Sequence, residues 1–275
     1  MPPRDADVEL LGRIDRYLDA VPRVAARAEP VGPFTLFVNN GPGWTYYARP
    51  TPAPSVIGSD DVAAVVGRQR ALGVPVALEW IDELVPDLEP AARGAGLQVE
   101  RHPLMHLPPG AFVPIPPPAG FELRRVRPTD DVAQVQAVGA VAFRAPGMDP
   151  GPSGAGAIRA ASKNVPTDLV RFVRDRWSRD VTITVAAFTN GRPVAIGSHQ
   201  PVKRATEIVG VGTAPAFRRR GLGAAVTSLL IEDALRRGVA TIFLSAGDEP
   251  IARMYGRLGF VRVGTAGAAE PEAPG

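Results

Sequence analysis

Apolar and polar positions alternate along the chain in two successive series of predicted strands and helices. In the first series, strands are predicted where aromatic and β-branched residues gather, and helices where a polar cap precedes an apolar period. The predicted order is strand, strand, helix, strand, helix, strand, over residues 34–39, 44–50, 59–73, 74–80, 82–96 and 97–102. Proline disrupts a helix interior, so Pro86 and Pro90 leave undecided at which residues the second helix begins and ends.

The second series starts at residue 121 and is longer. It predicts a strand at 121–126, helices at 128–145 and 167–180, a hairpin, and then strand, helix, strand, helix, strand over 205–213, 221–238, 241–247, 249–259 and 260–266. The hairpin joins 181–190 to 192–202 at Asn190-Gly191, a pair typical of tight hairpin turns. Strands mixed with helices predict an α/β fold. Residues 145–157 are rich in glycine and proline, and we expect them to be disordered without a ligand or to form a substrate lid.

A proline-rich stretch at 106–120 separates the two series and predicts an extended, stiff connector. A chain of 275 residues is long enough for two domains. We therefore predict domains at 1–110 and 120–267, a linker at 111–119 and a disordered tail at 268–275. Residues 73–99 and 238–263 share one order of apolar strand, acidic residues, helix and strand, which favours an internal duplication.

Composition narrows the classes of function. The formal net charge is only +3, and the longest basic run is Arg218–Arg220, which argues against a dedicated nucleic-acid binder. The absence of cysteine excludes disulfides, zinc ribbons and a thiol nucleophile, and three scattered histidines predict no metal site. With neither a signal-peptide pattern nor a long apolar run, we expect a cytoplasmic protein without a membrane partner.

One basic, glycine-rich stretch, Thr213–Ala225, lies where a predicted strand passes into a helix. Unpaired amides at a helix N-terminus attract anions, and glycine lets a ligand approach the backbone. Arg218 and its neighbours can add charge-assisted bonds to phosphate oxygens. The GxxxxGK[ST] motif is absent, and Val226 stands where a dinucleotide fingerprint needs a small residue. The stretch therefore predicts a pyrophosphate site of another kind.

The C-terminal half, residues 119–266, resembles the GNAT (general-control-related N-acetyltransferase) superfamily. That family carries R/Q-x-x-G-x-G/A after its fourth strand, and Arg218–Gly223 matches it. It also carries A-x-x-L-Y-x-x-L-G-F at a later helix end, where this chain has Ala252–Phe260. The resemblance implies a GNAT fold, with a mixed, mostly antiparallel central sheet flanked by helices. It also implies acetyl-CoA as acyl donor and no metal.

The resemblance carries over a set of cofactor-binding positions. The fourth strand would bond the pantetheine through its backbone, and the following loop would hold the pyrophosphate. The implied residues are Val211, Gly212, Thr213, Arg218, Arg219, Arg220, Gly221, Leu222, Gly223, Ala224 and Asp248. Asp248 departs from the family pattern, which has asparagine seven residues before the tyrosine, and a negative charge near CoA phosphates would need an arginine to screen it.

Two residues are candidates for the chemistry. Tyr255 matches the family tyrosine that protonates the departing CoA thiolate; otherwise it is a half-buried aromatic that closes the helix against the sheet. Glu207 precedes Gly221 by fourteen residues, the spacing of the general-base glutamate in the histone-acetylating branch. A protonated amine must lose a proton before it attacks. His199 or water could take that proton instead, and Glu207 would then be a solvent-facing strand residue.

The first half carries neither motif, and it has the acidic Gly58–Asp61 where the loop should lie. It resembles the degenerate N-terminal copy of a tandem GNAT protein, whose expected role is to pack on the catalytic domain and shape the acceptor cleft. The leading hypothesis is acetyl transfer from acetyl-CoA to a small-molecule amine. The alternative is a non-catalytic acyl-CoA-binding or regulatory module. The acceptor, the acyl chain and the oligomeric state, a homodimer included, stay open.

Overall fold

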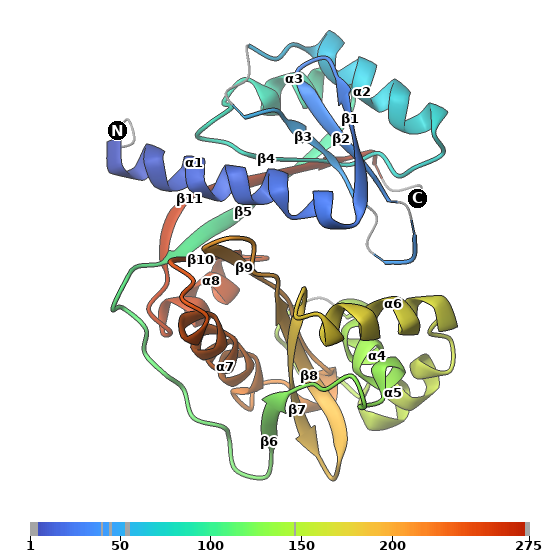
Figure 1. The fold of residues 1–275 in the computed structure, drawn as a ribbon, viewed down its shortest axis with the longest axis vertical. Helices are drawn as coiled ribbons and strands as arrows, with labels where there is room; N and C mark the ends of the chain where they lie inside the picture. The colour runs from blue at the N-terminus through green and yellow to red at the C-terminus, as the bar shows by residue number, and fades with distance from the viewer. Residues whose placement is uncertain (1–4, 40, 44–45, 53–55, 146, 273–275) are drawn as a thin grey trace. The chain divides into compact units, whose positions relative to one another are not determined.

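The computed structural model describes residues 5–39, 41–43, 46–52, 56–145 and 147–272. These residues form two compact α/β units (Figure 1). The first unit comprises residues 1–105, 245–249 and 262–275, and the second comprises 106–244 and 250–261.

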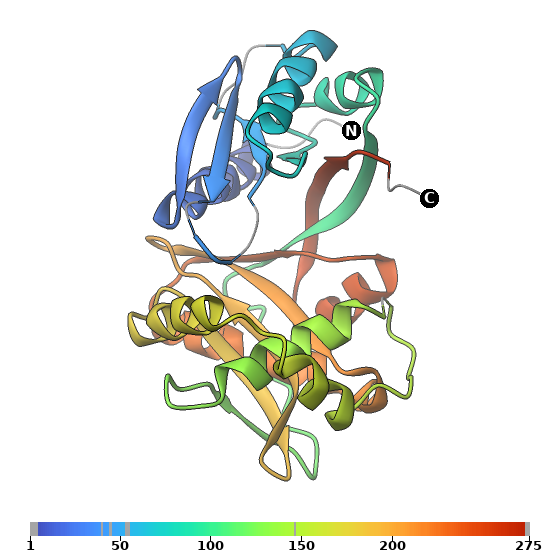
Figure 2. The same cartoon turned by 90° about the vertical axis from the view of Figure 1, so that its right-hand side faces the viewer.

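The sheet of the first unit includes the last strand of the chain. Its strand order is β1-β2-β3-β4-β11-β5. The bounds are β1 Ala26–Val31, β2 Phe34–Asn39, β3 Ala48–Pro50, β4 Leu78–Ile81, β5 Gln98–Leu107 and β11 Val261–Glu270. Figure 2 shows β11, in red, alongside β5, in green. The β1–β2 and β4–β11 pairs are antiparallel, whereas β3 and β4 are parallel.

The position of β11 differs from the expectation that 120–267 forms one domain and that 268–275 is a frayed tail. Residues 266–269 pair with β4, and Ala269 is buried. Small residues make this close pairing feasible, because a Cβ at Gly267 would lie only 2.3 Å from Cε2 of Trp80. The pattern of single apolar positions gives no sign of such a distant pairing.

The helices of the first unit are α1 Asp5–Ala20, η1 Pro22–Val24, α2 Ser59–Ala71 and α3 Leu88–Gly94. The sequence analysis missed α1 and β1, although Leu10, Ile14 and Tyr17 follow a helical period and are buried. The helix predicted at 82–96 is confined to α3, with turns before it around Pro86. Of the strand predicted at 44–50, β3 is present, and residues 44 and 45 lie outside the described residues.

The second unit has the strand order β10-β9-β8-β7-β6. Its strands are β6 Glu122–Arg125, β7 Ile183–Thr189, β8 Arg192–His199, β9 Ala205–Thr213 and β10 Thr241–Ser245. Its helices are α4 Val132–Phe143, α5 Ala155–Ser162, α6 Thr167–Ser178, η2 Pro215–Phe217, α7 Leu222–Arg236 and α8 Glu249–Gly256. Helix α7 packs on β7–β9, and α4 packs on β8 and β9 from the other face (Figure 1).

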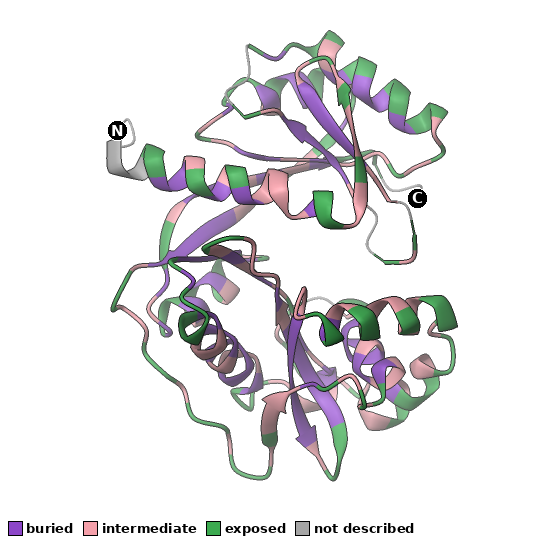
Figure 3. Cartoon of the chain, viewed as in Figure 1, coloured by how far each residue is buried: buried purple, intermediate pink, exposed green. Residues whose placement is uncertain are grey.

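Local signals explain most of these elements. The predicted hairpin is confirmed: Thr189 pairs with Arg192, and Asn190 and Gly191 have φ values of 48° and 69°. The predicted cap of α4 is also present, because the Asp131 carboxylate accepts a hydrogen bond from the amide of Gln134 at 3.0 Å. Strands β7 and β8 are buried along most of their length (Figure 3), as expected for a sheet covered on both faces.

The glycine-rich segment 145–157 differs from the expected disorder, apart from residue 146, which lies outside the described residues. Helix α5 begins at Ala155. Before it, the amide of Gly151 donates to the carbonyl of Pro215 at 3.2 Å, and the amide of Ala216 donates to the carbonyl of Ser153 at 3.0 Å. These bonds place the segment against η2, a contact that residue periodicity does not encode.

Candidate functional site

Strands β9 and β10 pair over only part of their length. They are parallel, and their pairing runs from Ala205 opposite Thr241 to Glu207 opposite Phe243, although β9 continues to Thr213. Backbone amides and carbonyls of a strand seek partners, and a strand that has left its neighbour presents them to a ligand. The far end of β9 is therefore suited to bind an extended chain through its backbone.

A bulge at Gly210 reshapes this end of β9. The register with β8 shifts between Ile196 opposite Gly212 and Ser198 opposite Val209, so two residues of β9 stand opposite one of β8. Gly210 has φ +62°, the left-handed conformation that glycine adopts at such bulges. The bulge accentuates the twist of the strand where the β9–β10 pairing has ended.

The loop after β9 leads directly into α7. Gly221 precedes the helix with φ +78°, and Arg219 also has a positive φ of 62°. The first backbone bond of the helix runs from the amide of Ala225 to the carbonyl of Gly221 at 3.0 Å. By helix geometry, the amides of residues 222–224 have no intrahelical acceptor. Residues 218–224, the cofactor loop, thus present a helix N-terminus suited to an anion.

The three arginines of the cofactor loop differ in what they contact. Arg219 and Arg220 are exposed, and the guanidinium of Arg220 lies 5.5 Å from the centre of the Phe217 ring. Arg218 is half-buried and donates to four backbone carbonyls, those of Ala142, Ala145, Asp149 and Thr213. The sequence analysis assigned all three arginines to phosphate; in the structure, four of the five N–H groups of Arg218 donate to backbone carbonyls.

Tyr255 lies on α8 and is buried. Its ring packs edge-on against Phe260 with the ring centres 6.0 Å apart. Burial raises the pKa of Tyr255 above its ordinary value, and a hydrogen bond with Thr227 offsets part of that rise. The hydroxyl of Thr227 donates to the carbonyl of Gly223 at 2.9 Å. A chain of hydroxyls therefore joins Tyr255 to the first turn of α7, and the phenol stays protonated at neutral pH.

Thr227 is a neighbour of the candidate acid that sequence reasoning missed. The available signal was its position four residues after Gly223, since residues at that spacing lie on the same side of a helix. The contact with Tyr255, twenty-eight residues further along, depends on the packing of α8.

Glu207 and His199 lie on opposite faces of the sheet. His199 pairs with Ile208 and so shares its face, and the neighbouring Glu207 points to the other face. His199 is fully buried beneath α7, where Nδ1 lies 3.1 Å from Oγ1 of Thr206 and Nε2 lies 3.1 Å from Oδ2 of Asp233. The structure does not bring the two candidate bases together, and both ring nitrogens of His199 are engaged.

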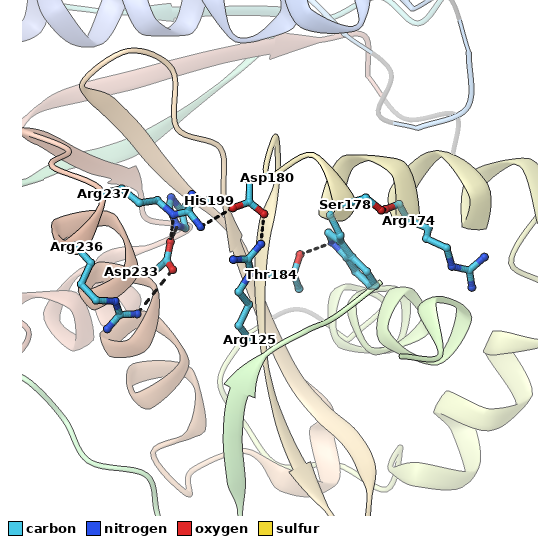
Figure 4. A network of polar contacts seen from close by, with 10 residues as sticks. Arg125, Arg174, Ser178, Asp180, Thr184, His199, Asp233, Arg236 and Arg237 are labelled. Carbon is cyan, nitrogen blue, oxygen red and sulfur yellow. Dashed lines mark hydrogen bonds and ion pairs between the residues drawn. The ribbon is translucent and has the colours of Figure 1, made fainter. Parts of the chain in front are cut away.

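His199 belongs to a charged network beneath α7 (Figure 4). Asp233 also accepts from Arg237, and Arg237 donates to Asp180 at 2.9 Å. Arg125 completes the network with a second bond to Asp180. Burial lowers the pKa of His199, and the hydrogen bond to Asp233 opposes that change only in part. The imidazole is therefore neutral in the folded protein at neutral pH.

This burial predicts a pH-dependent stability. Below the ordinary histidine pKa of about 6.5, the unfolded chain binds a proton that buried His199 does not, so stability falls as the pH drops through this range. His199 by itself makes the free energy of unfolding in urea lower at pH 5.5 than at pH 7.5, whereas Glu79, whose pKa burial raises to about 7, contributes in the opposite sense, so the test is the comparison with a variant. His199→Gln should show a smaller difference; an equal difference in both proteins would contradict the assignment.

Asp248 lies in the turn between β10 and α8 and is half-buried. It falls in the segment 245–249, which belongs to the first unit, whereas the cofactor loop belongs to the second. Its expected contact with the cofactor stays a prediction.

Helix α2 of the first unit is the expected counterpart of α7, and it begins differently. The carboxylate of Asp61 accepts a hydrogen bond from the amide of Gly58 at 3.0 Å, and Asp60 and Asp61 both lie in the first turn of α2. These carboxylates already stabilise the positive end of the helix and repel phosphate. The sequence-based expectation that this copy lacks a pyrophosphate site has this physical basis.

Two negative findings concern the part of the chain that the structure describes. Within it, no group of three or more His, Cys, Asp or Glu side chains is arranged to hold a metal ion. No helix among these residues is both long and apolar enough to cross a membrane.

Comparisons with known proteins concern the sequence of part of the chain and its fold. Residues 158–260 match the model of the acetyltransferase (GNAT) family. The chain is similar to a GCN5-related N-acetyltransferase from Kribbella flavida, at 22% identity over 96% of both chains with a TM-score of 0.68. A GCN5-related N-acetyltransferase from Sphaerobacter thermophilus is 18% identical over 89% of this chain and 82% of its own, with a TM-score of 0.57.

A third similar structure is a tandem GNAT protein from the clavulanic acid biosynthesis pathway, at 14% identity over 98% of this chain and 97% of its own. Its TM-score is 0.56. At these identities the likeness shows the fold, which confirms the predicted GNAT fold and agrees with a degenerate N-terminal copy. No curated protein sequence matches the chain.

Proposed function

We propose that the chain is an N-acyltransferase that moves acetyl from acetyl-CoA to a small-molecule amine, since its residues 158–260 match the model of the acetyltransferase (GNAT) family. One observation carries the proposal. Strand β9 leaves β10 after Glu207, and it leads into a helix N-terminus whose first amides lack intrahelical acceptors. An extended pantetheine along β9 would place its pyrophosphate at the cofactor loop.

The roles of the loop follow from this arrangement. The amides of residues 221–224 would bond the pyrophosphate oxygens, and the exposed Arg219 and Arg220 would add positive charge. Val211, Gly212 and Thr213 would bond the pantetheine through their backbone.

The reaction needs two proton transfers. The amine nitrogen attacks the thioester carbonyl, a C–N bond forms, the C–S bond breaks, and the products are an amide and CoA. Glu207 would accept the amine proton, and Tyr255 would give its proton to the leaving sulfur after turning from Thr227. A backbone amide of β9 would stabilise the oxyanion.

The absence of cysteine gives this proposal a clean test. A thiol reagent will report only released CoA, because the protein contributes no thiol. Acetyl-CoA is incubated with a panel of amino acids, polyamines and aromatic amines, with mass spectrometry of the products. Amine-dependent CoA release with a matching acetylated product supports the enzyme. Binding of acetyl-CoA with no amine-dependent release from any member would favour the alternative, a non-catalytic acyl-CoA-binding module.

The base assignment gives a separate prediction. If Glu207 accepts the amine proton, Glu207→Gln should lower kcat by about 10²- to 10⁴-fold at neutral pH. The loss should shrink as the pH rises, because more of the amine is then already deprotonated. Acetyl-CoA affinity should barely change.

The control for this experiment is Glu232→Gln, which removes a partly exposed carboxylate from α7 in the same unit. It should leave kcat unchanged at every pH. If Glu207→Gln is equally silent across the pH range, water or another group takes the proton.

A further inference from the structure

Arg218 donates four of its five N–H groups to backbone carbonyls, which leaves one for a ligand. Nη2 donates to the carbonyls of Ala142, at 2.8 Å, and Ala145. Nη1 donates to the carbonyl of Asp149 at 3.1 Å, and Nε donates to that of Thr213 at 3.2 Å. Three of these acceptors lie in residues 142–145 and 147–153, which comprise the last two residues of α4 and the chain after it and are here called the post-α4 segment. The fourth ends β9.

The guanidinium suits these acceptors by charge and shape. Ala142 lies in the last turn of α4, where carbonyls lack intrahelical donors and carry partial negative charge. A planar fork with five N–H donors can reach carbonyls in several directions, which an ammonium cannot do in the same way. A phosphate could bind two N–H groups of this guanidinium only if at least one of these carbonyls lost its donor.

Backbone contacts join the same two stretches of chain a second time. The amides of Gly151 and Ala216 donate to the carbonyls of Pro215 and Ser153. A Cβ at Gly151 would lie 3.1 Å from Cβ of Pro215, so the chains approach closely here. The post-α4 segment is thus bonded both to the start of the cofactor loop and to η2 just before it.

The same stretch borders the strand proposed to hold the pantetheine. Phe143, at the end of α4, is 61% exposed, a large value for an aromatic side chain. A Cβ at Gly212 would lie 3.5 Å from Cζ of Phe143, so the ring stands over β9. A change in the post-α4 segment would therefore alter the surroundings of β9.

We propose that Arg218 is a positioning residue that ties the post-α4 segment to the cofactor loop, so that CoA bound at the loop also holds the segment in place. This inference rests on the proposed function for the identity of the ligand. It assigns the phosphate contacts to the loop amides and the two exposed arginines, and it assigns the first arginine of the motif to the protein itself.

Hydrogen exchange on the full chain tests whether Arg218 couples the post-α4 segment to the cofactor loop. Backbone exchange of residues 142–153 and of residues 219–224 is measured by mass spectrometry with and without CoA. In wild type, CoA should slow exchange in both stretches. Arg218→Lys keeps the positive charge but removes the planar guanidinium that bonds several carbonyls at once. Without ligand, backbone exchange in the post-α4 segment should therefore rise about tenfold. CoA should then protect residues 219–224 but no longer protect the post-α4 segment.

Arg220→Gln is the matched variant, because Arg220 is exposed and makes none of these bonds. It should lower CoA affinity, measured by calorimetry, and leave exchange of the ligand-free post-α4 segment unchanged. Arg218→Lys should raise exchange of the ligand-free post-α4 segment and keep CoA affinity within about threefold of wild type. A purely structural role for Arg218 would raise exchange in the segment but leave the CoA-dependent protection there intact.

Three results would overturn the inference. The first is unchanged exchange of the ligand-free post-α4 segment in Arg218→Lys, and the second is retained protection of that segment by CoA in the same variant. The third is a loss of CoA affinity in Arg218→Lys as large as that in Arg220→Gln. Wild type that binds no CoA would overturn the proposed function and the coupling with it, whereas the ligand-free comparison would still decide whether Arg218 holds the segment.

Discussion

Gly223→Asp is expected to abolish measurable acetyl-CoA binding while the protein stays as stable as wild type. Gly223 is the second residue of α7, so the new carboxylate would lie among the amides proposed to bind pyrophosphate. Two like charges about 4 Å apart repel by about 4 kcal/mol at an effective dielectric constant of about 20. That repulsion corresponds to nearly three orders of magnitude in affinity.

The same charge should not harm the fold. A carboxylate in the first turn of a helix stabilises it by about 0.3–1 kcal/mol. A Cβ at Gly223 would lie 3.8 Å from Cγ1 of Val211, which is ordinary contact. Gly221 is a poorer site for the test, because its φ of +78° would strain any other residue.

Calorimetry of the full chain measures this effect. Wild type should bind one acetyl-CoA per chain, since Asp61 bonds the backbone at the start of α2 in the first unit. Gly223→Ala, the matched control, should retain binding, and urea unfolding should show both variants to be at least as stable as wild type. Unchanged affinity in Gly223→Asp would remove the basis of the proposed cofactor site.

Tyr255→Phe is expected to lower kcat by about 10²- to 10⁴-fold without a comparable change in acetyl-CoA affinity. The missing proton is needed on the leaving sulfur, so raising the pH should not restore the rate, in contrast to Glu207→Gln. Because burial raises the pKa of Tyr255, the wild-type rate should not fall from phenol ionisation at or below the ordinary tyrosine pKa of about 10.

CoA release with an amine from the panel checks this prediction. Tyr17→Phe is a matched control, because Tyr17 is also buried but lies on α1 in the first unit. It should leave kcat unchanged. A Tyr255→Phe enzyme with the wild-type rate, or one that regains its rate at high pH, would remove Tyr255 as the acid.

Local physics accounts for what could be predicted along the chain. The Asn190-Gly191 turn, the Asp131 cap and the start of α7 depend on residues within a few positions of one another. The cofactor loop was found for the same reason, since a helix N-terminus and its glycines are contiguous in sequence. The resemblance to a family then gave these local features a function.

The elements that escaped prediction have partners far away in the sequence. Residues 266–269 of β11 pair with β4, and neither stretch carries a sign of the other. The post-α4 segment lacks a period of its own and is held by bonds to residues 213–218. Such pairings depend on shape and on unsatisfied backbone groups, which a hydrophobic pattern does not record.

For this protein, the sequence by itself determined the α/β class, the GNAT motifs and the positions of Tyr255, Glu207 and the cofactor loop. Only the tertiary structure decided how these residues are used. It turned Arg218 towards carbonyls, because the end of α4 supplies acceptors beside it, and it separated His199 from Glu207, because neighbours on a strand point to opposite faces. Residue type limits which bonds a side chain can make, and the packing of distant segments selects which of them form.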